Sequence, residues 1–243
     1  GQIVGRTEAD GTGSVPHEVV ASAMFDGSSL CASCHNETLF GALAATVTEW
    51  QQQIYGGSPT CVDCHMTDWN SGAILHAAAG GHSNRMRLAA FMIEFPEPVV
   101  GGPLQVDVTN VGAGHNAPTG ENFRAFELHV TVMEVRTQRV VLDDYLSITT
   151  VIRTPIDKEI VWYDQEDAIA AGETRTLEYG TLDPGRYDIA AELVYYQIKP
   201  TVLRSVSKPH LSYLEPFGET VVRTWEAELE IEPDADLWEP LSL

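Results

Sequence analysis

CASCH at residues 31–35 and CVDCH at residues 61–65 are two copies of one pattern, Cys-x-x-Cys-His, and they contain all four cysteines of the chain. Two thiols one helical turn apart can both form thioethers with the vinyl groups of a haem, and the histidine that follows can ligate its iron. The sequence therefore predicts two c-type haems. The predicted attachment residues and proximal ligands are Cys31, Cys34 and His35 for the first haem and Cys61, Cys64 and His65 for the second.

Two other kinds of site also use paired cysteines. A structural zinc site is one alternative, but residues 35–60 separate the two pairs by more than the roughly 15–20 residues of a zinc ribbon. Zinc would also give no reason for a histidine directly after each pair. A dithiol oxidoreductase is the other alternative, and it would require a βαβ context that the sequence does not show. Haem is therefore the preferred interpretation.

The balance of charged residues limits the expected partners. The 243 residues carry a formal net charge of −21 at pH 7. Nucleic acids and anionic membrane surfaces would repel such a chain, so they are excluded as expected partners and cationic partners are favoured. The sequence contains no apolar run of transmembrane length, so no segment is expected to span a bilayer.

The expected compartment follows from the haem chemistry. Covalent haem attachment takes place outside the cytoplasm in bacteria and archaea. The chain begins at Gly1 rather than at a methionine and shows no signal-peptide pattern. We therefore expect that a targeting segment was removed before Gly1, and that the protein is extracytoplasmic: periplasmic, at the cell surface or extracellular.

Residues 1–95 are expected to form a small dihaem module of loops and short helices. A covalent haem supplies a large apolar core of its own, so the polypeptide around it can be short. Helices are predicted over residues 46–54 and 83–91, and apolar residues of the second segment recur at near-helical spacing.

Residues 96–243 follow a different pattern. Prolines and glycines between residues 96 and 103 mark the boundary. Several alternating strands with turns between them and no interleaved helices predict an immunoglobulin-like antiparallel β-sandwich, so the fold class is α+β or mainly β. Apolar and polar residues alternate with the period of a strand over residues 104–108, 126–133, 187–195 and 221–231.

The second axial position of each iron decides what the haem can do. A second histidine gives a six-coordinate electron-transfer haem, a methionine raises the reduction potential, and an empty position permits catalysis. His129 lies on the polar face of a predicted strand and His210 lies in a late loop, so both are interpreted as surface residues. The remaining candidates are His17, His76, His82 and His115.

These four histidines differ in their surroundings. His17 is close enough to the first motif to fold over its haem, although a surface position explains it nearly as well. His76 and His82 flank Ala-Ala-Ala-Gly-Gly, small residues that let the backbone approach a porphyrin face. His115 lies in GAGHNAPTG, residues 112–120, where glycines and a proline predict a rigid, sharply turned loop.

Several of these segments together resemble the multihaem c-type cytochromes related to cytochrome c554. Residues 28–36, 48–50 and 61–66 carry the haem motifs and their flanks. HAAAGGH at residues 76–82 resembles the His-x-Phe-x-Gly-Gly-His element of that family, with alanine in place of its aromatic residue. Residues 112–120 are similar to its Gly-His-x-x-Pro-Thr-Gly loop, and the resemblance covers about residues 17–135.

The resemblance implies roles for the candidate histidines. Haems in such proteins are mostly bis-histidine and carry electrons. Carried over to this sequence, His82 and His115 become the first choices as distal ligands, His76 the next and His17 the fourth. In that family the loop corresponding to residues 110–120 leads into a β-domain, so this loop is expected to contact a haem.

Three functions from different classes follow. The leading expectation is a dihaem electron-transfer protein, not an enzyme, that exchanges electrons with other redox proteins. An alternative is a haem enzyme, a reductase or a peroxidase-like protein, with one open iron. A third is a subunit of an extracellular conductive filament, the resemblance extending to such filaments, in which a copy of the chain shares an axial histidine across the interface.

Overall fold

The computed structural model describes the haem-motif segments and most of the predicted strands. The described residues are 2–5, 18–25, 27–36, 38–39, 42–43, 45–53, 58–68, 70–75, 77–99, 101–120, 124–149, 151–153, 162–164, 168–198 and 219–232. Over these residues the protein is mainly β with a few short helices, as expected from the sequence. None of the described helices is long and apolar enough to cross a membrane.

The N-terminal part contains the helices. A 3-10 turn, η1 (Ala23–Phe25), precedes four short α-helices. The predicted helices over residues 46–54 and 83–91 are both present in shorter form. In chain order the α-helices are α1 (Ser29–His35), α2 (Thr46–Gln52), α3 (Cys61–His65) and α4 (Asn84–Ala90).

Two small strand pairs accompany these helices. β1 (Gln2–Gly5) pairs in parallel with β2 (Glu18–Ala21). β3 (Thr38–Leu39) pairs with β4 (Ala42–Leu43) in an antiparallel turn between α1 and α2.

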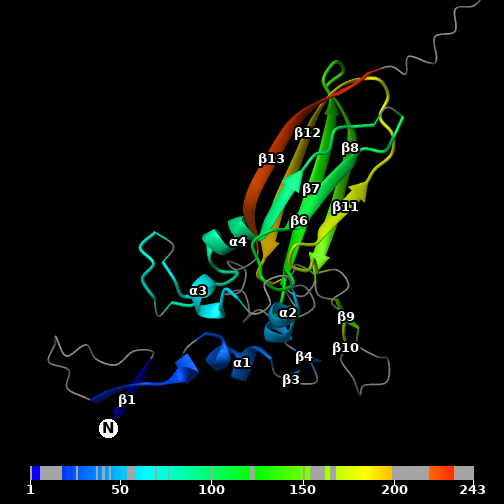
Figure 1. The fold of residues 1–243 in the computed structure, drawn as a ribbon. Coiled ribbons are helices and arrows are strands. Elements are labelled where there is room, and N and C mark those ends of the chain that lie inside the picture. Colours follow the sequence, from blue (N-terminus) through cyan, green and yellow to red (C-terminus); the bar gives the residue numbers. More distant parts are fainter. Residues whose placement is uncertain are drawn as a thin grey trace, which may run out of the picture.

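The rest of the described chain forms two antiparallel sheets (Figure 1). One has the strand order β11-β6-β5 and the other β13-β12-β7-β8. The three-stranded sheet contains β5 (Phe91–Glu94), β6 (Gln105–Asn110) and β11 (Thr174–Glu178). The four-stranded sheet contains β7 (Ala125–Glu134), β8 (Arg139–Thr149), β12 (Gly185–Tyr196) and β13 (Glu219–Ile231).

Among the described strands, the order along the chain changes sheet three times: from β6 to β7, from β8 to β11, and from β11 to β12. A separate antiparallel pair, β9 (Val151–Arg153) and β10 (Trp162–Asp164), lies on the second of these connections.

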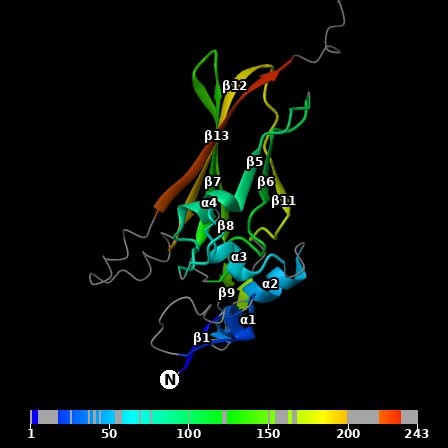
Figure 2. The ribbon, with the colours of Figure 1, turned by 60° about the vertical axis from the view of Figure 1, so that its left-hand side comes forward.

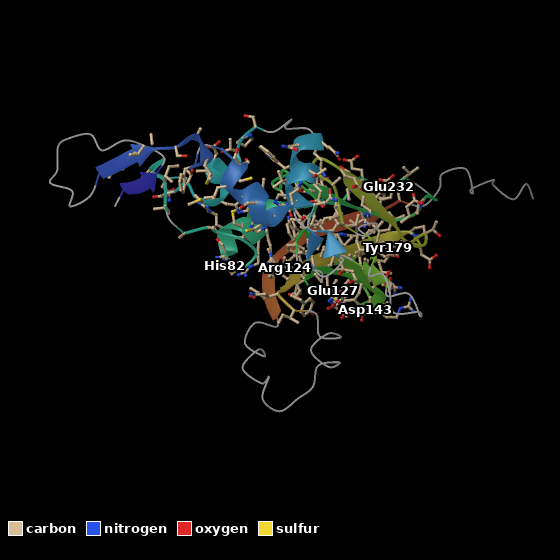
Figure 3. The ribbon with its side chains drawn as sticks, turned by 90° about the horizontal axis from the view of Figure 1, so that it is seen from below. His82, Arg124, Glu127, Asp143, Tyr179 and Glu232 are labelled. Atoms are coloured by element: carbon tan, nitrogen blue, oxygen red, sulfur yellow. The ribbon has the colours of Figure 1, made fainter. Side chains whose placement is uncertain are left out.

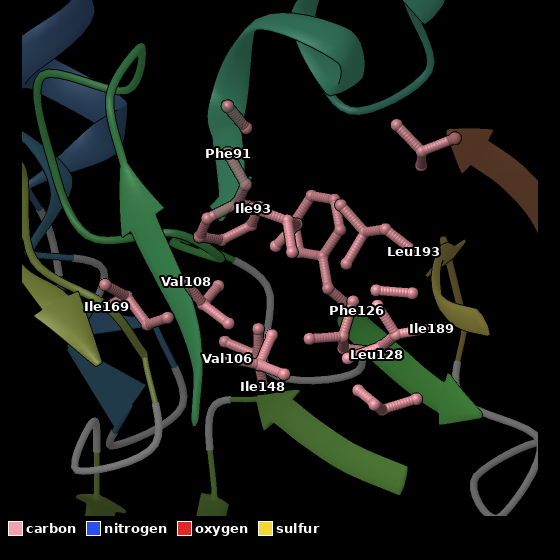
Figure 4. Packing of buried hydrophobic residues seen from close by; sticks show 14 of the residues in the cluster. Phe91, Ile93, Val106, Val108, Phe126, Leu128, Ile148, Ile169, Ile189 and Leu193 are labelled. Atoms are coloured by element: carbon pink, nitrogen blue, oxygen red, sulfur yellow. The ribbon is translucent and has the colours of Figure 1, made fainter. Parts of the chain in front are cut away.

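The inner faces of the two sheets share one hydrophobic core (Figure 4). Burial alternates along β6 and β7, as the period-2 sequence pattern predicts, because successive side chains of a strand point to opposite faces. Each fully buried Val, Leu or Ile contributes roughly 1.5–3 kcal/mol by leaving water. Core residues with no exposed surface include Val106, Val108, Leu128, Val130, Val132, Ile148, Ile169, Ala191 and Leu193.

The three-stranded sheet begins before residue 96, with β5. β5 starts directly at the end of α4, and Phe91 and Ile93 are both buried in the shared core. The apolar residues of segment 83–91 continue directly into the apolar residues of β5. Their spacing in the sequence therefore could not show where the helix ends and the strand begins. Three of the predicted strands lie within β7, β12 and β13, and the fourth overlaps β6, which starts one residue later than predicted. In the two large sheets, β5, β8 and β11 were not predicted.

The helices gather at one end of the sandwich. α1, α2 and α3 lie beyond that end in both ribbon views, and α4 lies beside β13 (Figures 1 and 2). Where the helices meet the sheets, the backbone of the loop after β6 lies in close contact with the backbone of α4. A β-carbon on Gly112 would lie 1.9 Å from the carbonyl oxygen of Ala89, so glycine is required at that position.

Replacing Gly112 by alanine is therefore expected to destabilise the protein by about 1–3 kcal/mol, because the backbone of α4 must shift to admit the methyl group. Gly180→Ala is the matched control, since a β-carbon there would meet nothing within 4 Å. Urea unfolding followed by far-ultraviolet circular dichroism measures both variants. Equal midpoints for the two variants would contradict the described packing.

Candidate functional site

The second Cys-x-x-Cys-His motif forms α3, and a capping box defines where this short helix begins. The Thr60 hydroxyl oxygen accepts a hydrogen bond from the backbone N–H of Asp63 at 3.3 Å. In return, the Asp63 carboxylate accepts from the backbone N–H of Thr60 at 2.9 Å. Reciprocal bonds of this kind satisfy free amides at a helix start. They hold the helix that carries Cys61, Cys64 and His65.

Side-chain hydrogen bonds join the two motif helices. The Ser28 hydroxyl, at the start of α1, accepts from the backbone N–H of Cys61 at 3.1 Å. At the other end of α1, the Asn36 side chain accepts from the backbone N–H of Thr48 at 3.1 Å, which ties α1 to α2. The two haem motifs are thus held next to each other rather than on separate parts of the surface.

The four thiols are unpaired and partly exposed or exposed. Burial raises the pKa of Cys31, and the adjacent Cys61 raises it further through charge and a hydrogen bond. Burial and then Asp63 raise the pKa of Cys64. Among the described residues, no three or more His, Cys, Asp or Glu side chains converge in a way that could hold a metal ion by themselves.

The imidazoles of His65 and His115 lie opposite each other. Their centroids are 6.2 Å apart and their planes differ by 12°. This separation is too long for direct ring stacking. A ring nitrogen ligates a first-row transition metal at about 2.0 Å and lies about 1.1 Å from its ring centre, so two imidazoles on opposite sides of one metal hold their centroids about 6.2 Å apart. The observed separation matches that arrangement.

Hydrogen bonds select the nitrogen that each ring offers. His65 Nδ1 bonds the carbonyl oxygen of Ala79, and His115 Nδ1 bonds that of Asn116 at 2.8 Å. A carbonyl oxygen only accepts, so both Nδ1 atoms must carry the proton. The unprotonated nitrogen of each ring is then Nε2. Metal-ligating histidines commonly donate their other N–H to a carbonyl in this way, which orients the ring.

The environment keeps His115 neutral. Burial lowers the pKa of His115 to about 4, His65 and His35 lower it as well, and the bond to the Asn116 carbonyl acts in the opposite direction. Above pH 5 the imidazole is therefore uncharged, which is the form that ligates a metal.

Asn110 fixes the loop that carries His115. Its side chain is buried and lies at the end of β6. The amide nitrogen donates to the carbonyl oxygens of His115 and Ile169, each at 2.9 Å. The amide oxygen accepts from the backbone N–H of Ala113 at 3.0 Å. One buried side chain thus satisfies three backbone groups around the loop.

α2 holds the same loop from the side of the haem motifs. The buried Glu49 carboxylate accepts from the backbone N–H of Asn116 at 3.3 Å and from the Thr119 hydroxyl at 2.8 Å. The Gln53 side chain, just after α2, donates to the Asn116 side chain at 2.5 Å and accepts from the backbone N–H of Ala171. The His115 loop is therefore bound both to the sandwich and to the helical part.

The other predicted ligands are not paired with a second imidazole among the described residues. His35 and His82 are exposed, and among the described residues no histidine ring is paired with His35 as His115 is with His65. His17 and His76 lie outside the described residues, as does His210. His129, predicted to face solvent, lies on the outer face of the four-stranded sheet beside Asp143 and Tyr145.

Sequence reasoning missed the residues that position His115. Asn110, Glu49 and Gln53 act through contacts between segments far apart in the chain, and no local pattern marks them. Glu49 comes nearest to a residue that the sequence could have marked as one that positions His115. It is an acidic residue two positions after Val47, and both are buried in α2.

The residues present fit a c-type haem at the second motif. Cys61 and Cys64 lie one helical turn apart, His65 follows them, and a second neutral imidazole lies at the separation expected across one metal. At the first motif, Cys31, Cys34 and His35 lie on α1 in the same spacing.

Comparison with known proteins is informative at the level of the fold. No protein-family model and no curated protein matches the chain. The chain is similar in structure to a penta-haem cytochrome c552 from Thermochromatium tepidum, with a TM-score of 0.69 and 19% sequence identity. The match covers 92% of this chain and 61% of that one, so this chain spans less than two thirds of that protein. The protein described here thus shares the fold of a multihaem c-type cytochrome.

A superoxide reductase (neelaredoxin) from Archaeoglobus fulgidus also aligns, over 62% of this chain and 94% of that one. With a TM-score of 0.30 and 10% identity, it carries no argument about fold or function.

Asn110→Asp is expected to destabilise the protein by at least about 2 kcal/mol, because it removes two hydrogen-bond donors and adds a charge to a buried position. Asn84→Asp is the matched control, since Asn84 is exposed at the first position of α4, where a negative charge is tolerated. Urea unfolding at pH 7 compares the two. If both variants unfold at the same urea concentration, the Asn110 side chain does not fix the His115 loop as described.

Proposed function

We propose that this protein is an extracytoplasmic dihaem c-type cytochrome that carries electrons. The haems are attached through Cys31 and Cys34 and through Cys61 and Cys64. His35 and His65 are their proximal ligands. The shared fold with a multihaem c-type cytochrome supports haem-based electron transfer as the general class.

The observation that carries the proposal is the pairing of His65 with His115. A centroid separation of 6.2 Å and two carbonyl-bound Nδ1 atoms fit a bis-histidine iron, and near-parallel planes are one of the orientations that such a pair adopts. Six-coordinate haem exchanges electrons without binding a substrate at the metal. His115 is therefore the proposed distal ligand of the second haem.

The polypeptide supplies ligation, burial and position. Bound haem supplies an iron that alternates between its ferrous and ferric states. His65 and His115 would ligate the iron in both states, and the hydrogen bonds of Asn110 and Glu49 hold the loop that carries the His115 ring. Little rearrangement is then needed when an electron arrives or leaves.

The iron of the haem attached at Cys31 and Cys34 needs a second axial ligand other than His115. The candidates are His82, which is exposed, His76 and His17, and a histidine from another copy of the chain. A ligand donated across an interface would join copies head to tail, and an open arrangement of that kind forms a filament. This is the basis for proposing other redox proteins, or copies of the same chain, as partners.

The division into two units is part of the proposal. Residues 1–95 form the dihaem module and residues 96–243 the β-domain, and β5, at the end of the module, pairs with β6 of the β-domain. The two antiparallel sheets, of three and four strands with crossing connections, support an immunoglobulin-like sandwich as the architecture of the second unit.

A second function is favoured by one observation. His35 is exposed and has no imidazole paired with it among the described residues. An iron at the first motif with an open position would permit catalysis, as in a reductase or a peroxidase-like haem enzyme. Electron transfer remains the first proposal because the second motif carries a complete pair.

His115→Met is expected to raise the reduction potential of one haem, because a thioether favours ferrous iron more than imidazole does. His115→Ala should leave the same haem with an open position and high-spin absorption features. His129→Ala is the control, since that histidine lies on the outer face of the sandwich. Redox titration followed by visible absorption resolves the two haems.

The haem content of each variant completes this experiment. A pyridine haemochrome assay should return two haems per chain for the native protein and for all three variants. A native protein with one haem or none would contradict the dihaem proposal. Potentials that are unchanged in His115→Met would contradict His115 as a ligand and leave the haem count standing.

A further inference from the structure

A buried cluster of polar groups lies where α4 meets the four-stranded sheet. Tyr195, near the end of β12, is only 3% exposed, and its hydroxyl has no hydrogen-bond partner. The Arg87 guanidinium lies over the Tyr195 ring, 5.5 Å from its centroid. The Nε atoms of Arg87 and Arg124 are also buried without a partner. Arg124 directly precedes β7, where Ala125 pairs with Tyr196, and its charge acts on the Tyr195 hydroxyl; Figure 3 labels Arg124 in the view from below.

This cluster lacks a negative charge. Among the described residues, neither Arg87 nor Arg124 forms an ion pair, although the chain carries a net charge of −21. Burial of two guanidinium Nε atoms and a hydroxyl without acceptors is costly, because buried polar groups in proteins are almost always satisfied. Arg87 Nη1 donates to the carbonyl oxygen of Gly81 at 2.9 Å, which leaves its other donors available. The set of donors fits a carboxylate.

The backbone places this cluster close to the second haem motif. His65 Nδ1 bonds the carbonyl oxygen of Ala79. Gly81 follows two residues later, at most about 7 Å further along the chain. A β-carbon on Gly81 would lie 2.2 Å from the Tyr195 hydroxyl, so the hydroxyl touches the Gly81 backbone. The distance between His65 and the Tyr195 hydroxyl is thus on the scale of a porphyrin radius.

The two arginines of α4 point to different ends of the site. Arg85 donates to the carbonyl oxygens of Thr67 at 3.0 Å and Cys64 at 3.4 Å, beside the thioether side of the motif. Arg87, two residues on, lies on another face of the helix and contacts Tyr195. The propionates of a haem are at the porphyrin edge opposite its vinyl groups, so Arg87 lies on the side where carboxylates are expected.

We infer that Arg87, Arg124 and Tyr195 form the binding site for a propionate of the haem attached at Cys61 and Cys64. The inference rests on the proposed haem function and adds the groups that tune its potential. Two cations beside a haem carboxylate offset its negative charge and favour the reduced iron. The buried hydroxyl donates a hydrogen bond to the same carboxylate.

Reduction potentials of the holoprotein variants test this assignment. Arg87→Gln, Arg124→Gln and Tyr195→Phe are each expected to shift the potential of one haem to a more negative value. That haem should be the one whose potential His115→Met raises. Tyr195→Phe keeps the ring that packs on Phe126 and removes only the hydroxyl, so it remains informative if an arginine variant folds poorly.

Arg186→Gln is the matched control. It removes the same charge from an exposed position on β12, nine residues before Tyr195 and therefore about 30 Å away along the strand. Both potentials should stay at their native values. If Arg87→Gln, Arg124→Gln and Tyr195→Phe also leave both potentials unchanged in a protein with two haems, the propionate assignment is wrong.

A free anion is the other source of negative charge for this cluster. In that case the native potential would change with added phosphate at constant ionic strength, and Arg87→Gln would abolish the change. This result would overturn the assignment to a propionate. A protein that contains no haem would instead refute the proposed function, so the two failures are distinguishable.

Discussion

The separation of the His65 and His115 imidazoles, 6.2 Å between centroids with planes 12° apart, is the constraint on which the rest of the site depends. One ring belongs to a five-residue helix that a capping box defines, and the other belongs to a loop at the end of the sandwich. Two rings on separate parts of the chain keep such a separation only if both parts are rigid and their junction is tight.

The junction is built accordingly. Asn110 fixes the loop to the sandwich, Glu49 fixes it to α2, and Gly112 lets α4 approach the backbone. The hydrophobic core of the two sheets provides the rigid support, because a loop anchored on packed strands moves less than one on a small helical module. In the proposed function, the two sheets therefore position the loop that supplies one of the proposed ligands.

Much of the architecture could be predicted from local patterns. The Cys-x-x-Cys-His repeats predict the attachment sites, and period-2 alternation predicts β6, β7, β12 and β13. β8 was missed because its exposed and half-buried residues do not alternate cleanly. The pairing of His115 with His65 could not be predicted from sequence either, because it depends on contacts of Asn110 and Glu49 across the fold. The pairing of Arg87 with Tyr195 is likewise a product of tertiary packing.

Electron paramagnetic resonance of the oxidised protein at low temperature tests the central claim most directly. Near-parallel axial imidazoles give a rhombic low-spin ferric signal, whereas perpendicular ones give a signal with a large maximum g value. With planes 12° apart, the signal that the native protein has and His115→Ala lacks should be rhombic and low-spin. If that difference signal is high-spin or has a large maximum g value, or if no signal is lost, His65 and His115 are not the axial pair of one iron.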